Sequence, residues 1–431
     1  MVQLPQELLD IIIDHLARDE FDASTIASLK ACSLSSKTLR RRSRGHLFSH
    51  VALKYNTHHL SPASEFRRLS AFKALLDGDR DLVHCIKSLE LWVDEFTLIG
   101  RQRTPLPDIF TILYSTPLTS LDTLTLRGSQ YRPLPWDIIP DYMQAALYNL
   151  FQSGSLEKVE IHHINNIPLH ILCTAHPALR SLSIVDATFD ELTTHPELHV
   201  GSYSSCNGPH LALNALSVDR SFHRLLPVIE RSPEGFGSSV SSLKEFRIVI
   251  DHEDRHHLPL NFLSTLQHLS CLTIFSYSYL GSEDFELDLG ALPTVSSLCL
   301  HFEVSTIRYA ALALNNAFAI LLQNGPNQVE NVAIKLDLPI SILDNWDMDG
   351  SVILSVTQKI AWSLLDASFA DERYPKLRRC DVSIKWVPMG VGSKLEGGGR
   401  DDARCTWLQR FFSPPPHIHH AVRVSVALEH S

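Results

Sequence analysis

The sequence has too little positive charge for a typical nucleic-acid-binding protein and too few long apolar runs for a membrane-spanning one. Its 38 Lys and Arg face 48 Asp and Glu, which gives a net charge of −10. A negative balance disfavours binding to bulk nucleic acid, so we expect no nucleic-acid partner. No window reaches the roughly 18 apolar residues of a membrane span, because Asn315 and Asn316 interrupt the longest apolar stretch. We therefore expect no membrane partner.

A secretory signal and paired cysteines are missing as well. The first residues show no basic segment followed by a small-residue cleavage site, so we expect no signal peptide. Eight cysteines are scattered through the chain without a CxxC pair. In a long chain without a secretory signal, this pattern is typical of free thiols in a reducing compartment. We expect the protein to be cytoplasmic and/or nuclear.

Motifs for catalysis, cofactors and metals are also absent. The sequence contains no G-x-S-x-G elbow. The glycine-rich stretch 389–405 has Leu395 where a dinucleotide fingerprint needs its third glycine, so we interpret it as a flexible loop. The densest set of potential metal ligands, DHEDRHH at 251–257, is better interpreted as a solvated loop after a strand. We expect no catalytic residue, cofactor or metal, and hence no enzyme.

What the chain does have begins with an unusually apolar first helix. The segment MVQLPQELLDIIIDHL places Pro5 in the first turn, where its missing N–H costs nothing. On a wheel of about 100° per residue, its apolar side chains cover about 200°, twice the width of an ordinary surface helix. This breadth predicts two buried faces, one within a small domain and one against the rest of the chain or a partner.

Two more short helices and a strand should follow. DASTIASLKACSL and SSKTLRRRSRGHLF have helical patterns, and HVALKY alternates like a strand. The basic run at 40–44 has two interpretations, a nuclear import signal or the solvated face of a helix, and the second is more common. Three short helices make a core so small that it gains stability by docking against another surface.

The segments LPQELLDIIIDHL, SLKACSLSSKTLR and HLFSHVAL together resemble the F-box, particularly the divergent F-boxes of basidiomycete fungi. The matched positions are Leu4, Pro5, Glu7, Leu8, Ile12, Leu16, Cys32, Ser33, Leu34, Ser36, His46, Leu47 and Phe48. F-boxes usually place a Trp shortly after the Cys-x-Leu element, and here Leu39 lies nearest. The resemblance implies an F-box-like domain at residues 1–53 that docks on the Skp-type adaptor, and through it the cullin, of an SCF ubiquitin ligase. We expect this surface to use Leu4, Pro5, Leu8, Leu9, Ile12 and Leu16.

The remaining 54–431 repeats the pattern apolar-x-x-apolar-x-apolar. Ten copies begin at Ile86, Leu121, Leu156, Leu179, Leu213, Leu243, Leu269, Val295, Val329 and Leu377. This pattern resembles the leucine-rich repeat, in which a short strand points two side chains inward and stacked neighbours bury them. Segments between the copies, such as DYMQAALYNLFQ and RYAALALNNAFAILL, have helical periodicity.

The fold class we predict is α/β: a short three-helix F-box-like unit followed by an irregular leucine-rich-repeat-like solenoid. The irregularity is expected because successive copies lie from 23 residues apart, between Leu156 and Leu179, to 48 apart, between Val329 and Leu377. AVRVSVALE near the end should add a closing strand. The alternative is a different α/β fold whose buried strands share the pattern.

These expectations lead to two functional hypotheses. In the first, the chain is a non-catalytic substrate receptor whose repeats bind an unknown protein substrate. In the second, it is a repeat scaffold for protein interactions without ubiquitin-ligase association, which the missing Trp favours. Because strand side chains alternate, we expect Trp92, Arg127 and Phe275 on the strand face opposite the inward pairs, where they would contact the substrate, since aromatics and Arg are favoured contact residues. The alternative is that long inter-repeat helices or loops cover this face, in which case Trp92 and Phe275 are core residues.

Overall fold

The computed structural model describes residues 5–17, 23–53, 62–93, 105–116, 118–129, 132–168, 170–173, 175, 177–190, 212–219, 222–231, 240–250, 260–277, 287–304, 307–339, 360–370, 373–387 and 422–428. Its chain divides into two compact units, residues 1–213 with 221–239 and residues 214–220 with 240–431. Among the described helices, none has the length and apolar character needed to cross a membrane.

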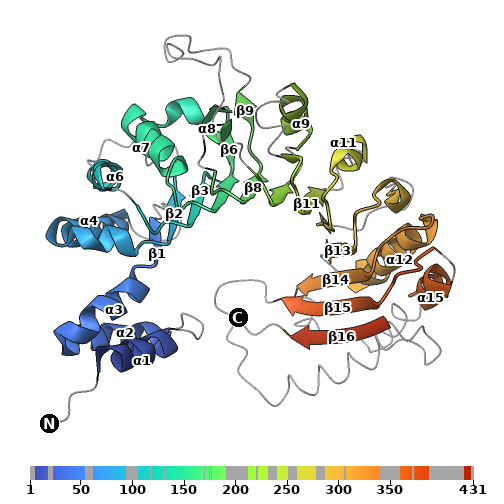
Figure 1. The fold of residues 1–431 in the computed structure, drawn as a ribbon, viewed down its shortest axis with the longest axis horizontal. Helices are drawn as coiled ribbons and strands as arrows, with labels where there is room; N and C mark the ends of the chain where they lie inside the picture. The colour runs from blue at the N-terminus through green and yellow to red at the C-terminus, as the bar shows by residue number, and fades with distance from the viewer. Residues whose placement is uncertain are drawn as a thin grey trace. The chain divides into compact units, whose positions relative to one another are not determined.

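Three helices open the first unit: α1 (Gln6–Leu16), α2 (Ala23–Ser35) and α3 (Lys37–Leu47). Pro5 is the residue immediately before α1, whereas the sequence predicted it in the first turn. Ser36 caps α3, because its side chain accepts a hydrogen bond from the Leu39 backbone N–H at 3.2 Å. Ile13 of α1 and Leu29 of α2 are fully buried between the helices. In Figure 1, the three helices lie at the β1 end of the first unit.

A parallel sheet follows in the first unit. Its strands are β1 (His50–Leu53), β2 (Ser88–Trp92), β3 (Thr123–Arg127), β5 (Lys158–His162) and β8 (Ser181–Val185). They lie in chain order, and each pairs with the next in parallel. The connections contain α4 (Pro62–Gly78), η1 (Arg80–Cys85), α6 (Leu106–Ser115), η2 (Trp136–Ile138), α7 (Asp141–Phe151) and α8 (His170–Cys173). The unit also includes α9 (Phe222–Arg231).

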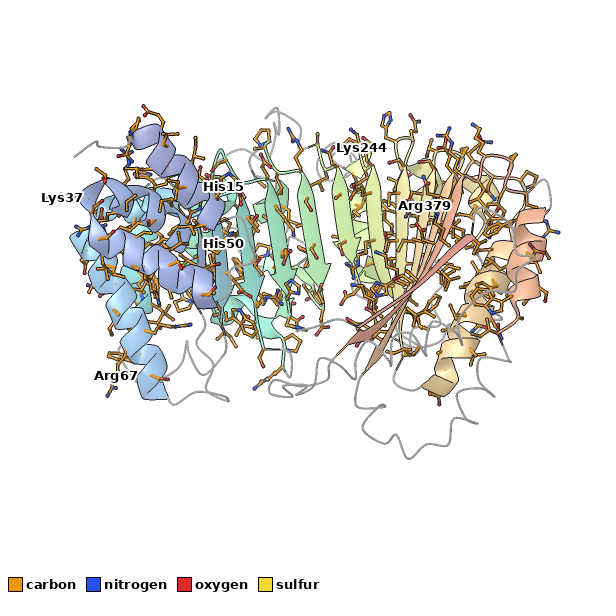
Figure 2. The ribbon with its side chains drawn as sticks, turned by 90° about the horizontal axis from the view of Figure 1, so that it is seen from below. His15, Lys37, His50, Arg67, Lys244 and Arg379 are labelled. Carbon is orange, nitrogen blue, oxygen red and sulfur yellow. The ribbon has the colours of Figure 1, made fainter. Side chains whose placement is uncertain are left out.

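The second unit repeats this plan, with longer strands after its first one. They are β10 (Ala215–Val218), β11 (Glu245–Ile250), β12 (Cys271–Ser276), β13 (Ser297–Glu303), β14 (Asn331–Pro339), β15 (Arg379–Val387) and β16 (Val422–Leu428). All neighbours pair in parallel and in chain order. Its helices are α11 (Leu260–Thr265), η4 (Leu289–Ala291), α12 (Ile307–Gln323) and α15 (Trp362–Ala370). In Figure 2, Lys244 and Arg379 mark the same edge of this sheet, where β11 and β15 begin.

The sequence predicted the strands well. Each of the ten copies of the apolar-x-x-apolar-x-apolar pattern ends in one of the parallel strands. The three apolar residues of each copy, which we call an apolar triplet, are buried, except for the half-buried Leu377. The predicted helices correspond to α7 and α12, and the predicted closing strand is β16. The predicted α/β class, with a three-helix unit ahead of a large parallel sheet, is confirmed. The predicted domain boundary at residue 53 falls inside the first compact unit, and the predicted loop at 389–405 lies outside the described residues.

A feature without a sequence prediction lies at the carboxyl ends of β3, β5 and β8. Two small parallel sheets form there, β4 (Leu134–Pro135) with β6 (Ile164–Asn165) and β7 (Ile167–Pro168) with β9 (Phe189–Asp190). The turns into them place His163, Asn166 and Asp186 at positive φ of 54°, 56° and 46°. Such backbone is uncommon for residues other than glycine, but His, Asn and Asp are the types that adopt it most readily, so the local sequence suits these turns.

Candidate functional site

The first helix carries an exposed apolar stripe. Leu8, Ile12 and Leu16 are 47%, 49% and 38% exposed, and Ile11 beside them is 51% exposed. Ile13, on the other side of the helix, is only 1% exposed. Single exposed apolar residues are ordinary, but a contiguous set on one helix face is typical of an interaction surface. We call Leu8, Ile11, Ile12 and Leu16 the apolar stripe.

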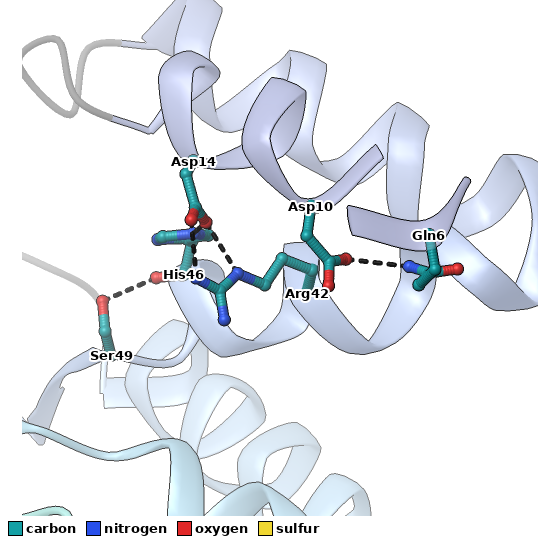
Figure 3. Close-up of polar contacts among 6 residues, drawn as sticks. All are labelled: Gln6, Asp10, Asp14, Arg42, His46 and Ser49. Atoms are coloured by element: carbon teal, nitrogen blue, oxygen red, sulfur yellow. Dashed lines mark hydrogen bonds and ion pairs between the residues drawn. The ribbon is translucent and has the colours of Figure 1, made fainter. Parts of the chain in front are cut away.

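Polar contacts between α1 and α3 hold the stripe in place. Arg42 Nε and Nη2 donate to the two carboxylate oxygens of Asp14, both at 2.6 Å, and His46 Nε2 lies 2.8 Å from Asp14 Oδ1. Within α1, Gln6 donates to Asp10 at 2.8 Å. Figure 3 shows this row of polar side chains running along the facing helices. The polar side of α1 therefore faces α3, which directs the apolar stripe away from it.

The Asp14 carboxylate stays charged because of these partners. Its hydrogen bond with Arg42 holds the pKa of Asp14 far below its ordinary value, and His46 acts in the same direction, although desolvation opposes both. Two parallel N–H···O bonds to one carboxylate also restrict geometry more than a single contact does. The Asp14 carboxylate therefore keeps its negative charge across the physiological pH range.

The six residues predicted for adaptor docking fall into three groups. Leu4 lies outside the described residues. Pro5 is exposed, as are the three predicted members of the apolar stripe, whereas Leu9 is half-buried towards the helical core. Ile11 was missed, since its place on the wheel borders the acidic side of α1. The assignment of these residues to an adaptor stays a prediction.

A cleft of about 620 Å³ lies between α2 and α3. The residues that line it are Ile26, Lys30, Ser33, Leu34, Arg44, His46, Leu47, Phe48 and His50. Leu34 is the most exposed large apolar side chain of the described residues, at 79%. Arg44 is fixed at one side of the cleft by Asp79, 2.6 Å away. The three-helix unit thus exposes apolar surface on α2 as well as on α1.

The outward strand face of the first unit carries one connected cluster of charges. Arg127 Nε lies 3.0 Å from Glu90 Oε1, and Arg127 Nη2 lies 3.9 Å from Glu160 Oε2. Glu160 also contacts Lys158 Nζ at 2.7 Å and His162 Nε2 at 3.5 Å. His162 and Lys158 together lower the pKa of Glu160 to about 2, against the opposing effect of burial. The positive charges of Arg127 and Lys158 on this face are therefore neutralised by glutamates of the same unit.

Two of the three predicted substrate-contact residues are neighbours in this cluster. The Arg127 guanidinium carbon lies 5.7 Å from the centre of the Trp92 ring, within reach of a cation–π contact. Both side chains are half-buried, so part of each is available to a partner. An aromatic beside an Arg is a typical interface anchor.

The third predicted residue, Phe275, differs from the expectation of an exposed aromatic. It is only 6% exposed. Its ring meets Tyr277 and His301 edge-on, with centroids 4.9 Å and 4.5 Å apart, and the Arg247 guanidinium carbon lies 5.3 Å from its centre. Phe275 thus points outward as alternation requires, but its neighbours on the same strand face cover it. Tyr277, at 55% exposed, presents aromatic surface in its place.

Groups suited to metal chemistry are not found in the described ranges, where no three His, Cys, Asp or Glu side chains are arranged to hold an ion. The histidine-rich segment 251–257 lies outside those ranges. The free cysteines of the described chain are Cys32, Cys85, Cys271, Cys299 and Cys380. Burial raises the pKa of Cys299 and of Cys380, so neither thiol is activated as a nucleophile.

Comparison with known proteins adds no family to these observations. No family model matches the chain, and no curated protein matches it. The functional argument therefore depends on the apolar stripe and on the outward strand faces.

Proposed function

We propose that this protein is a non-catalytic substrate-recognition adaptor of an SCF-type ubiquitin ligase. Residues 1–53 act as an F-box-like domain that docks on the Skp-type adaptor and so joins the cullin. Residues 54–431 form an irregular leucine-rich-repeat-like solenoid that captures a protein target. The protein acts in the cytoplasm and/or nucleus without a cofactor, a nucleic acid or a membrane, and the ubiquitin chemistry belongs to its partner subunits.

The observation that carries the proposal is the apolar stripe. Its four side chains lie on a helix whose other apolar face, at Ile13, is already buried in the three-helix core. Exposing so much apolar surface costs solubility, which favours a protein partner that covers it. The stripe also contains Leu8, Ile12 and Leu16, three positions that match the F-box pattern.

The parallel sheets support the repeat half of the proposal. In each unit the strands follow chain order, and the two inward side chains of each repeat align with those of the next strand, as Phe246 does with Leu272 and Leu272 with Leu298. A repeat of one strand and one helix cannot bury its own apolar face, whereas stacked repeats bury a continuous core. Such arrays offer long outward strand faces for binding.

Replacing Leu8 and Ile12 by Asp tests the proposal. Because both side chains are about half exposed, the double variant should fold normally and yet lose its partner. Affinity purification from cells followed by mass spectrometry should recover a Skp-type adaptor and a cullin with the wild type, and at least about tenfold less of both with Leu8→Asp/Ile12→Asp, because two buried charges would disrupt the interface core.

A matched control comes from apolar residues elsewhere. Leu75 and Leu312 are 40% and 38% exposed, on α4 and α12. The variant Leu75→Asp/Leu312→Asp should recover adaptor and cullin as the wild type does. Equal recovery of the adaptor with the α1 variant and with this control would remove the docking proposal.

A second candidate function is a repeat scaffold for protein interactions without ubiquitin-ligase association. Leu39, the half-buried residue nearest to the place of the usual F-box Trp, favours it. The same purification separates the two functions. A scaffold retains its target proteins but recovers neither adaptor nor cullin, and the α1 variant then changes nothing.

A further inference from the structure

The outward strand faces of the two units differ in how their cations are neutralised. In the first unit, Arg127 and Lys158 each lie within ion-pair distance of a glutamate. In the second unit, Arg247 on β11 and Lys335 on β14 are exposed. Among the described residues, neither of these two cations forms an ion pair. Their positive charge is therefore available to a partner.

Outward positions between these cations contain no carboxylate. The strand register aligns three positions each on β12, β13 and β14, which we call the β12–β14 window. The window consists of Cys271, Thr273, Phe275, Ser297, Cys299, His301, Asn331, Ala333 and Lys335. The acids nearest to it lie beyond its borders. Glu245 is in register with Cys271 on the β11 side, and Glu303 follows His301 on the same face of β13. Asp337 contacts His301 at 2.8 Å, and Asp381 contacts Arg379 at 2.5 Å.

Hydrogen-bond donors in the window are unused. In the described part of the chain, the side chains of Thr273, Ser297 and Asn331 make no hydrogen bond. Thr273 and Ser297 are half-buried, and Asn331 is exposed. These hydroxyl and amide donors can pair with carboxylate or backbone carbonyl oxygens of a bound chain.

Positive charge reaches the middle of the window from both sides. Burial raises the pKa of the Cys299 thiol, while Lys335 and Arg247 both act to lower it, so both cations act at the same central point. The Arg247 guanidinium extends from β11 to the Phe275 ring on β12. Strands about 4.8 Å apart put the backbones of β11 and β14 about 14 Å apart. About four extended residues span that distance.

We propose that the β12–β14 window binds an extended, carboxylate-rich peptide segment of a partner protein. Carboxylates three to four residues apart lie against Arg247 and Lys335, and the Thr273, Ser297 and Asn331 donors serve the oxygens between them. Charge complementarity of this kind selects partners more than it adds affinity. The inference deepens the proposed function by naming the class of target. Binding of the segment is independent of that function, whereas the segment is a ligase substrate only if the proposed function holds.

Fluorescence anisotropy with a fluorescein-labelled Glu-Glu-Ser-Gly-Glu-Glu peptide tests the inference on the full chain. The wild type should bind it more tightly than the all-Gln counterpart, and raising the salt should weaken binding, because exposed charges are screened. Arg247→Gln/Lys335→Gln should weaken binding at least about fivefold. The control Lys376→Gln/Arg423→Gln removes the same charges from exposed positions of the second unit outside the window and should bind as the wild type does.

Three results would overturn the inference: no binding by the wild type, equal binding by the Arg247/Lys335 variant, or binding only when phosphoserine replaces the glutamates. If the double variant unfolds, the two single variants repeat the comparison. No ligase component is present, and Leu8→Asp/Ile12→Asp should bind the peptide normally. A failed peptide assay and a failed adaptor purification therefore point to different proposals.

Discussion

At the scale of single residues, Glu160 contacts Arg127, Lys158 and His162 on the strand face of the first unit. Glu160→Gln should lower the free energy of unfolding by about 1–2 kcal/mol at neutral pH, because it removes the charge that Lys158 and His162 stabilise. The folded-state pKa of Glu160, about 2, lies below its ordinary 4.5. The stabilisation is therefore complete above pH 4.5 and is lost as the pH falls towards 2. Urea unfolding of both proteins at several pH values measures it.

The exposed Glu157, immediately before β5, is the control for that experiment. Glu157→Gln should change the unfolding free energy by less than about 0.5 kcal/mol at any of these pH values. A Glu160→Gln variant as stable as the wild type at neutral pH, or a difference that grows in acid, would contradict the assignment.

Single residues also show what the sequence predicted about the strand face. Alternation along each strand correctly predicted that Trp92, Arg127 and Phe275 point outward. It could not predict exposure, which depends on neighbours from other strands: His301 and Arg247 cover Phe275, while Trp92 keeps part of its surface. Those neighbours are about 26 or more residues away in the chain, so only the register of the strands brings them together.

At the scale of elements, the turn after β3 depends on Gly128. A Cβ added there would overlap the backbone carbonyl of His163, which follows β5 in one of the turns with positive φ. Gly128→Ala should therefore destabilise the first unit by about 2 kcal/mol or more. Gly45 in α3 has open space around it, so Gly45→Ala should stabilise the protein by about 0.5–1 kcal/mol. Thermal unfolding of the two variants should give shifts of opposite sign, and a tolerated Gly128→Ala would contradict the packing.

Elements differ in how far sequence alone predicts them. The apolar triplets predicted the parallel strands because each strand buries a local pattern, such as Leu121, Leu124 and Leu126. The two small parallel sheets, β4 with β6 and β7 with β9, were not predictable in the same way. Its strands have two residues each, and their backbone bonds, such as Ile167 N–H to the Thr188 carbonyl at 2.9 Å, join distant segments. The first helix was predicted in part: the helical wheel predicted two apolar faces, but it did not predict that the face with Ile13 would be the one buried in the three-helix core.

At the scale of the whole molecule, the proposed tasks lie on different elements. The apolar stripe is on α1, ahead of all strands, and the β12–β14 window belongs to the second compact unit. Substitutions in one should therefore leave binding at the other unchanged, since sites that share no contact partners act independently. This separation is what a receptor needs if it is to hold a ligase subunit and a target together.

Binding of the purified full chain to a purified Skp-type adaptor is the most direct test of this proposal. In size-exclusion chromatography, we predict that the wild type and Leu75→Asp/Leu312→Asp co-elute with the adaptor as a one-to-one complex. We predict that Leu8→Asp/Ile12→Asp elutes separately from it while keeping the circular dichroism spectrum of the wild type. Separate elution of the wild type from the adaptor, or co-elution of the α1 variant, would contradict the proposal that the apolar stripe docks this protein on a ubiquitin ligase.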